Sequence, residues 1–172
     1  MMQRTSFWLV LVIFLSSCGS QQTVLRPGDL QHPTTIILVR HAEKADDGTS
    51  DPALTPLGQS RAQRLAAMLA PMEVDAVYST PYKRTRLTGV PTAELKHLTV
   101  QEYSPNDKAF LSKLTSDYAG KTILVVGHSN TIPTLVNALT GKAYEQLGES
   151  EYDKLFIVEV VDGIGRVMVL SY

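Results

Sequence analysis

The sequence predicts an α/β protein of three layers, in which helices cover both faces of a mostly parallel sheet. Four short apolar runs of strand type alternate with helix-like segments between residues 35 and 139. Such alternation is typical of parallel strands joined by crossover helices. Two further apolar runs follow with only Asp162-Gly163-Ile164-Gly165 between them, which predicts an antiparallel hairpin at the end of the domain.

The predicted strands are β-branched and aliphatic runs bounded by turn residues. The first run, residues 35–39, is short and β-branched and predicts a buried strand, and the fourth, residues 122–126, is the most apolar. All six strands are expected at residues 35–39, 74–78, 98–101, 122–126, 155–161 and 166–170.

The predicted helices are recognised by their ends and by apolar stripes. Thr55 is a suitable cap before Pro56 at the first helical position, and Gly141 is expected to close the last helix. Residues 42–54 are polar and are expected to form a loop. The helices are expected at residues 56–70, 81–89, 106–118 and 131–139.

The N-terminus has the features of a bacterial export signal. Arg4 precedes an unbroken apolar run at residues 7–15, which is too short to cross a bilayer but suits a signal-peptide core. Leu15-Ser16-Ser17-Cys18 resembles the lipobox of bacterial lipoproteins. The resemblance implies a signal peptide over residues 1–17, a lipidated Cys18 with a tether over residues 18–33, and a domain over residues 34–172. The alternative is an ordinary secretory signal with an incidental cysteine.

These features predict a lipid-anchored protein of the bacterial cell envelope that faces the periplasm. The outer membrane is preferred because Gly19, and not aspartate, follows Cys18. Contact with the membrane is expected through the lipid anchor only. Cys18 is the only cysteine, which excludes an internal disulfide and cysteine catalysis in the domain. With 16 Lys and Arg against 17 Asp and Glu, the composition gives no reason to expect a nucleic-acid partner.

Charged and histidine residues stand at the ends of the first four predicted strands. Arg40 and His41 follow the first strand, Arg84 comes shortly after the second, Glu102 after the third and His128 after the fourth. The carboxyl ends of parallel strands share one edge, where ligands of open α/β sheets bind. We therefore expect these five side chains in one pocket, and this set suits a phosphate ester.

Four motifs, in chain order, resemble those of the histidine phosphatase superfamily, whose fold is phosphoglycerate-mutase-like. The similarity spans about residues 35–139, and alanine replaces the glycine of the usual Arg-His-Gly-Glu signature. The motifs are Arg40-His41-Ala42-Glu43, Leu54-Thr55-Pro56-Leu57-Gly58, Ser79-Thr80-Pro81-Tyr82-Lys83-Arg84-Thr85 and Gly127-His128-Ser129.

The resemblance implies that His41 is a nucleophile forming a phosphohistidine, and that Arg40, Arg84 and His128 hold the phosphoryl group. A neutral imidazole nitrogen can attack phosphorus when its other nitrogen is fixed by an acceptor. Guanidinium groups bind phosphate oxygens with two donors, and charge and positioning dominate phosphoryl transfer. No cofactor is expected. No metal is expected either, because the arginines would repel a cation from a zinc site built on the two histidines.

The leaving oxygen needs a proton, and Glu102 is the preferred donor because this family often carries an acid just past the third strand. A solvated loop glutamate is the alternative for Glu102. Glu43 is the competing acid, interpreted instead as a supporting residue that pairs with an arginine or Lys44. Asn130 stands where a helix begins after the fourth strand and could face the substrate or only cap that helix.

Together these features predict a metal-independent phosphomonoester hydrolase. In the superfamily that the motifs resemble, mutase activity usually comes with longer insertions after the first and third strands, whereas the segments that separate Arg84, Glu102 and His128 are short. The resemblance therefore implies an open pocket and hydrolysis instead of phosphoglycerate-mutase-type phosphotransfer. The expected substrate is a small phosphorylated compound, such as a sugar phosphate or another phosphomonoester, or a phosphohistidine protein. The alternative of another class is an envelope lipoprotein that binds phosphate or a phospho-ligand without turnover.

Overall fold

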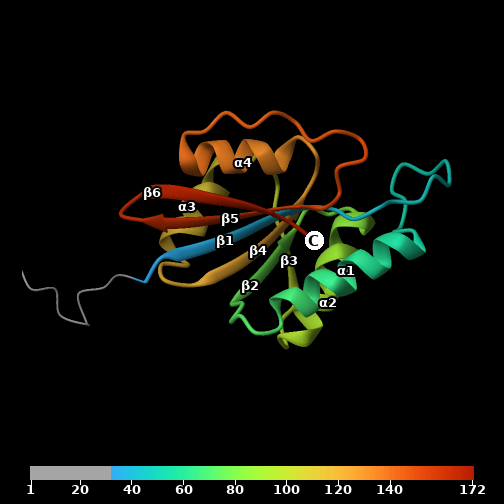
Figure 1. Cartoon of the computed structure of the whole chain (residues 1–172), viewed down its shortest axis with the longest axis horizontal. Coiled ribbons are helices and arrows are strands. Elements are labelled where there is room, and N and C mark those ends of the chain that lie inside the picture. Colours follow the sequence, from blue (N-terminus) through green and yellow to red (C-terminus); the bar gives the residue numbers. More distant parts are fainter. Residues whose placement is uncertain (1–31) are drawn as a thin grey trace, which may run out of the picture. The chain divides into compact units, whose positions relative to one another are not determined.

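The computed structural model describes residues 32–172, so the predicted signal peptide, the lipidated Cys18 and most of the tether lie outside the described residues. One six-stranded sheet forms the centre of the domain (Figure 1). Its strands are β1 Thr34–Arg40, β2 Ala76–Ser79, β3 Val100–Glu102, β4 Thr122–Gly127, β5 Lys154–Val161 and β6 Ile164–Ser171. They lie in the order β3-β2-β4-β1-β5-β6.

The sheet is parallel from β3 to β1 and antiparallel from β1 to β6. The pairs β2–β3, β2–β4 and β1–β4 are parallel, whereas β5 runs antiparallel to both β1 and β6. The predicted mostly parallel sheet with a closing antiparallel hairpin is therefore confirmed. Because β1 and β4 are central, their carboxyl ends meet in the middle of one edge of the sheet.

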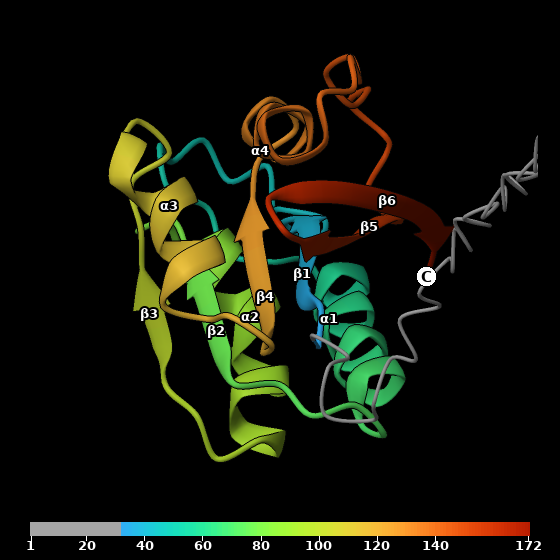
Figure 2. The ribbon, with the colours of Figure 1, turned by 90° about the vertical axis from the view of Figure 1, so that its left-hand side faces the viewer.

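Four helices cover the two faces, as predicted (Figure 2). They are α1 Pro56–Leu69, α2 Lys83–Leu95, α3 Lys108–Ser116 and α4 Thr131–Thr140. None of these helices, within residues 32–172, combines the length and apolar character needed to cross a membrane. The predicted cap of α1 is present, because the Thr55 hydroxyl accepts a hydrogen bond from the Gly58 N–H at 3.0 Å.

Two apolar cores lie on opposite sides of the sheet. Ile36 and Leu38 of β1 pack on the side of α3 and α4. Ile37 and Val39, which alternate with them, pack on the side of α1 and α2. All four side chains are fully buried, so β1 is fixed from both faces. The strand that precedes Arg40-His41 is thus packed tightly from both faces.

The second helix is longer than the sequence predicts. We expect an end near Gly89, but α2 continues to Leu95 with Pro91 inside it. Gly89 serves close packing, because a Cβ there would lie 3.1 Å from a methyl group of Val77 in β2. Burial of Thr92 and Ala93 in the last turns outweighs the helix-breaking preference of proline, which costs about 3 kcal/mol in a helix interior.

The other elements differ from prediction only at their ends. Strand β3 begins at Val100, two residues later than expected. Strand β6 begins at Ile164, because the hairpin turn consists of Asp162 and Gly163 alone. Their φ values of 51° and 77° are those of a two-residue turn with both residues in the left-handed region, which matches the twist of the strands.

Candidate active site

The carboxyl ends of β1, β2 and β4 meet around one pocket. In the register of β1 and β4, Arg40 lies opposite Gly127, and the His41 N–H donates to the Gly127 carbonyl at 2.9 Å. This pairing brings the rings of His41 and His128 to a centroid distance of 5.5 Å. The pocket has a volume of about 540 Å³ and is lined by Arg40, His41, Lys44, Tyr82, Arg84, Pro105, Asn106, His128, Ser129, Asn130, Thr131 and Glu149.

His41 is held in the tautomer that a nucleophile needs. Its Nδ1 lies 2.8 Å from the Ala42 carbonyl oxygen. A carbonyl only accepts hydrogen bonds, so Nδ1 carries the proton and Nε2 carries a lone pair. Burial, together with the charges of Arg40 and Arg84, lowers the pKa of His41 from 6.5 to about 4. The ring is therefore neutral at physiological pH.

Arg40 is fixed by uncharged groups. Its Nη1 donates to the carbonyl oxygens of Gly148, Glu149 and Glu151, at 2.7, 3.1 and 3.3 Å. Its guanidinium carbon lies 4.1 Å from the centre of the Tyr152 ring. Its Nε is buried and has no hydrogen-bond partner within the described part of the chain. The positive charge is thus oriented by carbonyl dipoles and an aromatic face without being neutralised.

Arg84 is placed differently, at the start of α2. Its guanidinium carbon lies 4.3 Å from the centre of the Tyr82 ring. The Asp51 carboxylate approaches Nη1 at 3.8 Å, which is an ion-pair distance but too long for a hydrogen bond. The Arg84 Nε, like that of Arg40, is buried without a partner among the described residues. Two cationic side chains with unused donors therefore face one pocket.

A chain of hydroxyl groups orients His128. Its Nε2 lies 2.9 Å from the Thr80 hydroxyl, which lies 2.9 Å from that of Thr85. The Thr85 hydroxyl directs its single hydrogen to backbone carbonyl oxygens, with those of Thr80 and Tyr82 at 2.9 and 2.8 Å. Each hydroxyl has one hydrogen, so Thr85 accepts from Thr80, and Thr80 accepts from His128 Nε2–H. Burial, and then the charges of Arg84 and Arg40, lower the pKa of His128 to about 4.

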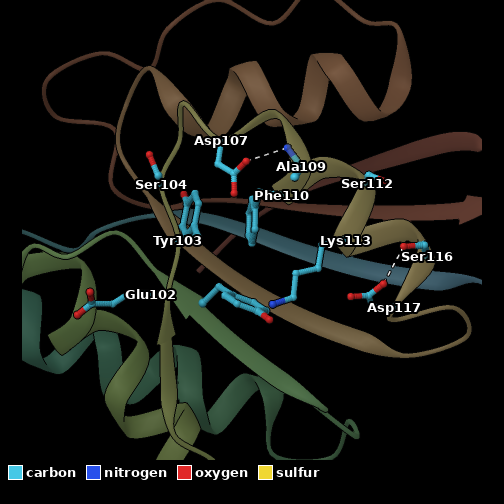
Figure 3. Close-up of a pocket in the computed structure, with 11 residues that line it drawn as sticks. Glu102, Tyr103, Ser104, Asp107, Ala109, Phe110, Ser112, Lys113, Ser116 and Asp117 are labelled. Carbon is cyan, nitrogen blue, oxygen red and sulfur yellow. Dashed lines mark hydrogen bonds between the residues drawn. The ribbon is translucent and has the colours of Figure 1, made fainter.

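The structure brings Arg40, His41, Arg84 and His128 together but places Glu102 beside this pocket. Glu102 ends β3, where it pairs with Arg86, and more than half of its side chain is exposed. It lines two neighbouring hollows of about 390 and 450 Å³ instead. In Figure 3 it points away from the stacked rings of Tyr103 and Phe110. Its proposed catalytic role stays a prediction.

Glu43 pairs with an arginine, one of the two partners that the sequence suggests for it. Its carboxylate accepts from Arg61 Nε at 3.0 Å and from Nη2 at 2.7 Å. Burial alone would raise the pKa of Glu43, but the hydrogen bonds from Arg61 hold it below its usual value. A Cβ at Gly58 would lie 2.3 Å from the Glu43 carbonyl oxygen. The glycine of this motif thus lets α1 pack directly on the backbone after His41.

Two further positions bear on the motifs. Ala42, which stands where the family signature has glycine, is fully buried with Leu54 and Ala62. Its N–H donates to the Thr88 hydroxyl at 2.9 Å. Its methyl group, which glycine would lack, packs in the small apolar cluster with Leu54 and Ala62. Asn130 precedes α4, lines the pocket and makes no capping bond with its side chain. This exposed side chain is therefore available to a ligand.

Sequence reasoning missed the loop between α4 and β5. Its carbonyl groups at residues 148, 149 and 151 and the Tyr152 ring hold Arg40, and the Glu149 side chain lines the pocket. Backbone acceptors leave no pattern in a sequence, so the carbonyl groups around Arg40 could not be predicted. The contacts of Tyr82 with Arg84 and of Thr80 with His128 could have been, because both residues lie inside a recognised motif. In residues 32–172 there is no cluster of three or more His, Cys, Asp or Glu side chains that could hold a metal ion.

Comparison with known proteins finds a family similarity that includes most of the pocket. A sequence model of the histidine phosphatase superfamily (branch 1) matches residues 36–104, which include Arg40, His41, Arg84 and Glu102. This part of the chain is therefore similar in sequence to the histidine phosphatase superfamily. The chain is also 42% identical over 71 residues to phosphoserine phosphatase 1 of Hydrogenobacter thermophilus. That similarity covers 38% of this chain and 34% of the relative's length.

Solved structures show that the superfamily fold extends beyond the matched residues. The protein histidine phosphatase SixA complexed with tungstate superposes with a TM-score of 0.67 at 22% identity, covering 80% of this chain and 96% of SixA. The alpha-ribazole phosphatase from Shigella flexneri gives 0.66 at 16% identity, covering 80% and 96%. The predicted phosphoglycerate-mutase-like fold is therefore confirmed. His128, outside residues 36–104, reaches the pocket through this fold.

The low pKa values of the two histidines predict that acid destabilises the domain. Between pH 6.5 and about 4 the unfolded chain binds protons on His41 and His128 that the folded chain excludes. The free energy of unfolding should therefore fall by about 2 kcal/mol between about pH 7 and about pH 5.5, roughly half from each histidine, measured by urea denaturation. The fall should be smaller in His41→Gln and unchanged in His97→Gln, at an exposed position. Equal falls in His41→Gln and the wild type would contradict the assignment.

Proposed function

We propose that this chain is a metal-independent phosphomonoester hydrolase that acts through a phosphohistidine on His41. The observation that carries the proposal is the state of the His41 ring. Nδ1–H is fixed on a backbone carbonyl, and burial keeps the ring neutral, so the Nε2 lone pair is available beside Arg40 and Arg84. This combination of a neutral nucleophile with cationic groups suits attack on a phosphate dianion.

The proposed reaction has two displacements. His41 Nε2 forms a bond to phosphorus as the bond from phosphorus to the ester oxygen breaks, and that oxygen takes a proton from an acid. Water then attacks the phosphohistidine, the N–P bond breaks, and the acid recovers its proton from the water. Arg40 and Arg84 hold the phosphoryl oxygens in both steps. The Nε2–H of His128 donates to Thr80, so the neutral ring presents a lone pair at Nδ1, and it adds a donor there only after the bound phosphate dianion has stabilised the protonated ring.

Two carboxylates compete for the acid role in this proposal. Glu102 would have to leave Arg86 and turn toward the pocket. Glu149 already lines the pocket, and its own carbonyl is fixed on Arg40 at 3.1 Å. Among the pocket-lining residues that the structure describes, Glu149 is the one with a carboxylate. We therefore favour Glu149 as the proton donor and keep Glu102 as the second candidate.

The proposed substrate is a small phosphorylated compound. The relative from Hydrogenobacter thermophilus is named a phosphoserine phosphatase, and structural neighbours are named alpha-ribazole and protein histidine phosphatases. The pocket adjoins a hollow of about 450 Å³, with which it shares Tyr82, Pro105 and Asn106. This hollow gives room for the leaving group of a sugar phosphate, another phosphomonoester or a phosphohistidine side chain.

We also propose that the protein is a lipoprotein of the bacterial envelope, anchored through Cys18 and facing the periplasm. Support comes from the apolar run at residues 7–15 and the small residues before Cys18. An exported position would direct the pocket to phosphate esters outside the cytosol, and an outer-membrane location is preferred.

The nucleophile can be tested with p-nitrophenyl phosphate in the presence of EDTA. The wild type is expected to release p-nitrophenol, and His41→Ala to lower kcat at least about 1,000-fold, because no intermediate can form. Quenching the wild type in alkaline detergent should trap phosphate on the chain that is stable to alkali and released by acid. A wild type that binds orthovanadate without turnover would instead identify a phosphate-binding protein, and full activity in His41→Ala would overturn the mechanism.

The acid can be identified by changing the leaving group. Glu149→Gln is expected to slow glycerol phosphate about 100-fold and p-nitrophenyl phosphate less than about tenfold, because a nitrophenolate leaves without a proton. Glu102→Gln should affect both esters little. Glu145→Gln, an exposed position on the same loop outside the pocket, is the control. The opposite pattern would assign the role to Glu102.

The lipid anchor can be tested in a bacterial host by fractionation and labelled palmitate. The wild type is expected in the membrane fraction with incorporated label, and Cys18→Ala is expected to lose the label. Label-free wild-type protein in the soluble periplasmic fraction would point to an ordinary secretory signal.

A further inference from the structure

The polar loop between β1 and α1 is closed at its base. Lys44 and Leu54 form an antiparallel bridge, and the Ala45 N–H donates to the Ala53 carbonyl at 2.8 Å. The Thr55 N–H donates to the Glu43 carbonyl at 2.9 Å. These contacts fix the return arm of the loop, which carries Asp51, relative to the segment that follows His41.

Asp51 supplies the N-terminal cap of α2 from another part of the chain. Its Oδ1 accepts the backbone N–H of Lys83, the first residue of α2, at 2.9 Å. The residue at the usual capping position, Tyr82, makes no capping bond with its side chain. A carboxylate at this place also interacts favourably with the positive end of the helix dipole.

The same carboxylate oxygen faces the phosphate-binding arginine. Asp51 Oδ1 lies 3.8 Å from Arg84 Nη1, while the Tyr82 ring stacks on the Arg84 guanidinium at 4.3 Å. The guanidinium thus contacts both a carboxylate and an aromatic ring. Because the Asp51 contact is too long for a hydrogen bond, it orients Arg84 without taking up a donor that an oxyanion could use.

We infer that Asp51 is a positioning residue that sets the oxyanion affinity of Arg84, acting mainly through its bond to the Lys83 N–H. The inference rests on the proposed function, since it assumes that the pocket binds phosphate. The loop between β1 and α1, which the sequence shows only to be polar, then has a structural role: it is anchored beside His41 and places the Asp51 carboxylate at the start of α2. His41 and Arg84 are thereby held in fixed relation.

The test is calorimetric titration of the full-length chain in detergent with inorganic phosphate. Asp51→Ala is expected to weaken phosphate binding about tenfold, because the α2 start and Arg84 lose their restraint. Asp51→Asn retains the accepting oxygen and should stay within about threefold of the wild type. Asp51→Ala should also raise KM for p-nitrophenyl phosphate more than it lowers kcat, because an arginine that is present but displaced mainly affects binding.

Asp47→Ala is the matched control. It removes the same charge from the same loop, but Asp47 accepts hydrogen bonds only from Thr49, at 3.0 and 2.6 Å, so phosphate binding should not change. Should Asp51→Ala fail to fold, Asp51→Glu keeps the charge, displaces the acceptor by one methylene and is expected to weaken binding severalfold.

The outcomes separate this inference from the proposed function. If the wild type neither binds phosphate nor hydrolyses esters, both the proposed function and the role of Asp51 are contradicted. A wild type that binds phosphate, with Asp51→Ala or Asp51→Glu equally tight in a folded protein, overturns the role of Asp51 alone. If Asp51→Asn weakens phosphate binding as much as Asp51→Ala does, Asp51 does not act through its hydrogen bond to the Lys83 N–H.

Discussion

The site depends on the register of two buried parallel strands. Arg40 lies opposite Gly127, and the His41 N–H bonds to the Gly127 carbonyl at 2.9 Å, so the residues that follow β1 and β4 are adjacent. A shift by one residue would turn the alternating side chains of β1 to the wrong faces, and both faces are fully buried. The two apolar cores therefore fix the distance between His41 and His128.

The pocket collects positive charge, and within residues 32–172 neither of its arginines is hydrogen-bonded to a carboxylate. Carbonyl oxygens and Tyr152 hold Arg40, and Tyr82 holds Arg84, with Asp51 at 3.8 Å. Burying a cation in this way is costly unless it is well solvated by dipoles, which the carbonyls supply. The same burial and charge keep His41 and His128 neutral. The positive charge of such a site favours the binding of a dianion.

Several parts of the site could be predicted because their signals are local. Arg40-His41, the Thr55 cap and the Gly127-His128 pair each follow a recognisable strand or start a helix, and alternation fixed the fold class. Other parts have no local signal. The Glu102 pairing with Arg86, the continuation of α2 past Gly89 and the carbonyls around Arg40 all depend on contacts between distant segments.

By itself the sequence determined which side chains stand at the ends of the strands, and hence that two histidines and two arginines would share one edge. The reason is that strand alternation and capping are properties of short segments. Only the tertiary structure decided the state of those groups. The tautomer of His41, the supports of Arg40, and the position of Glu149 inside the pocket with Glu102 beside it arise from burial and from backbone groups. Every residue carries the same backbone groups, so only the packing of the folded chain determines which of them contact the site.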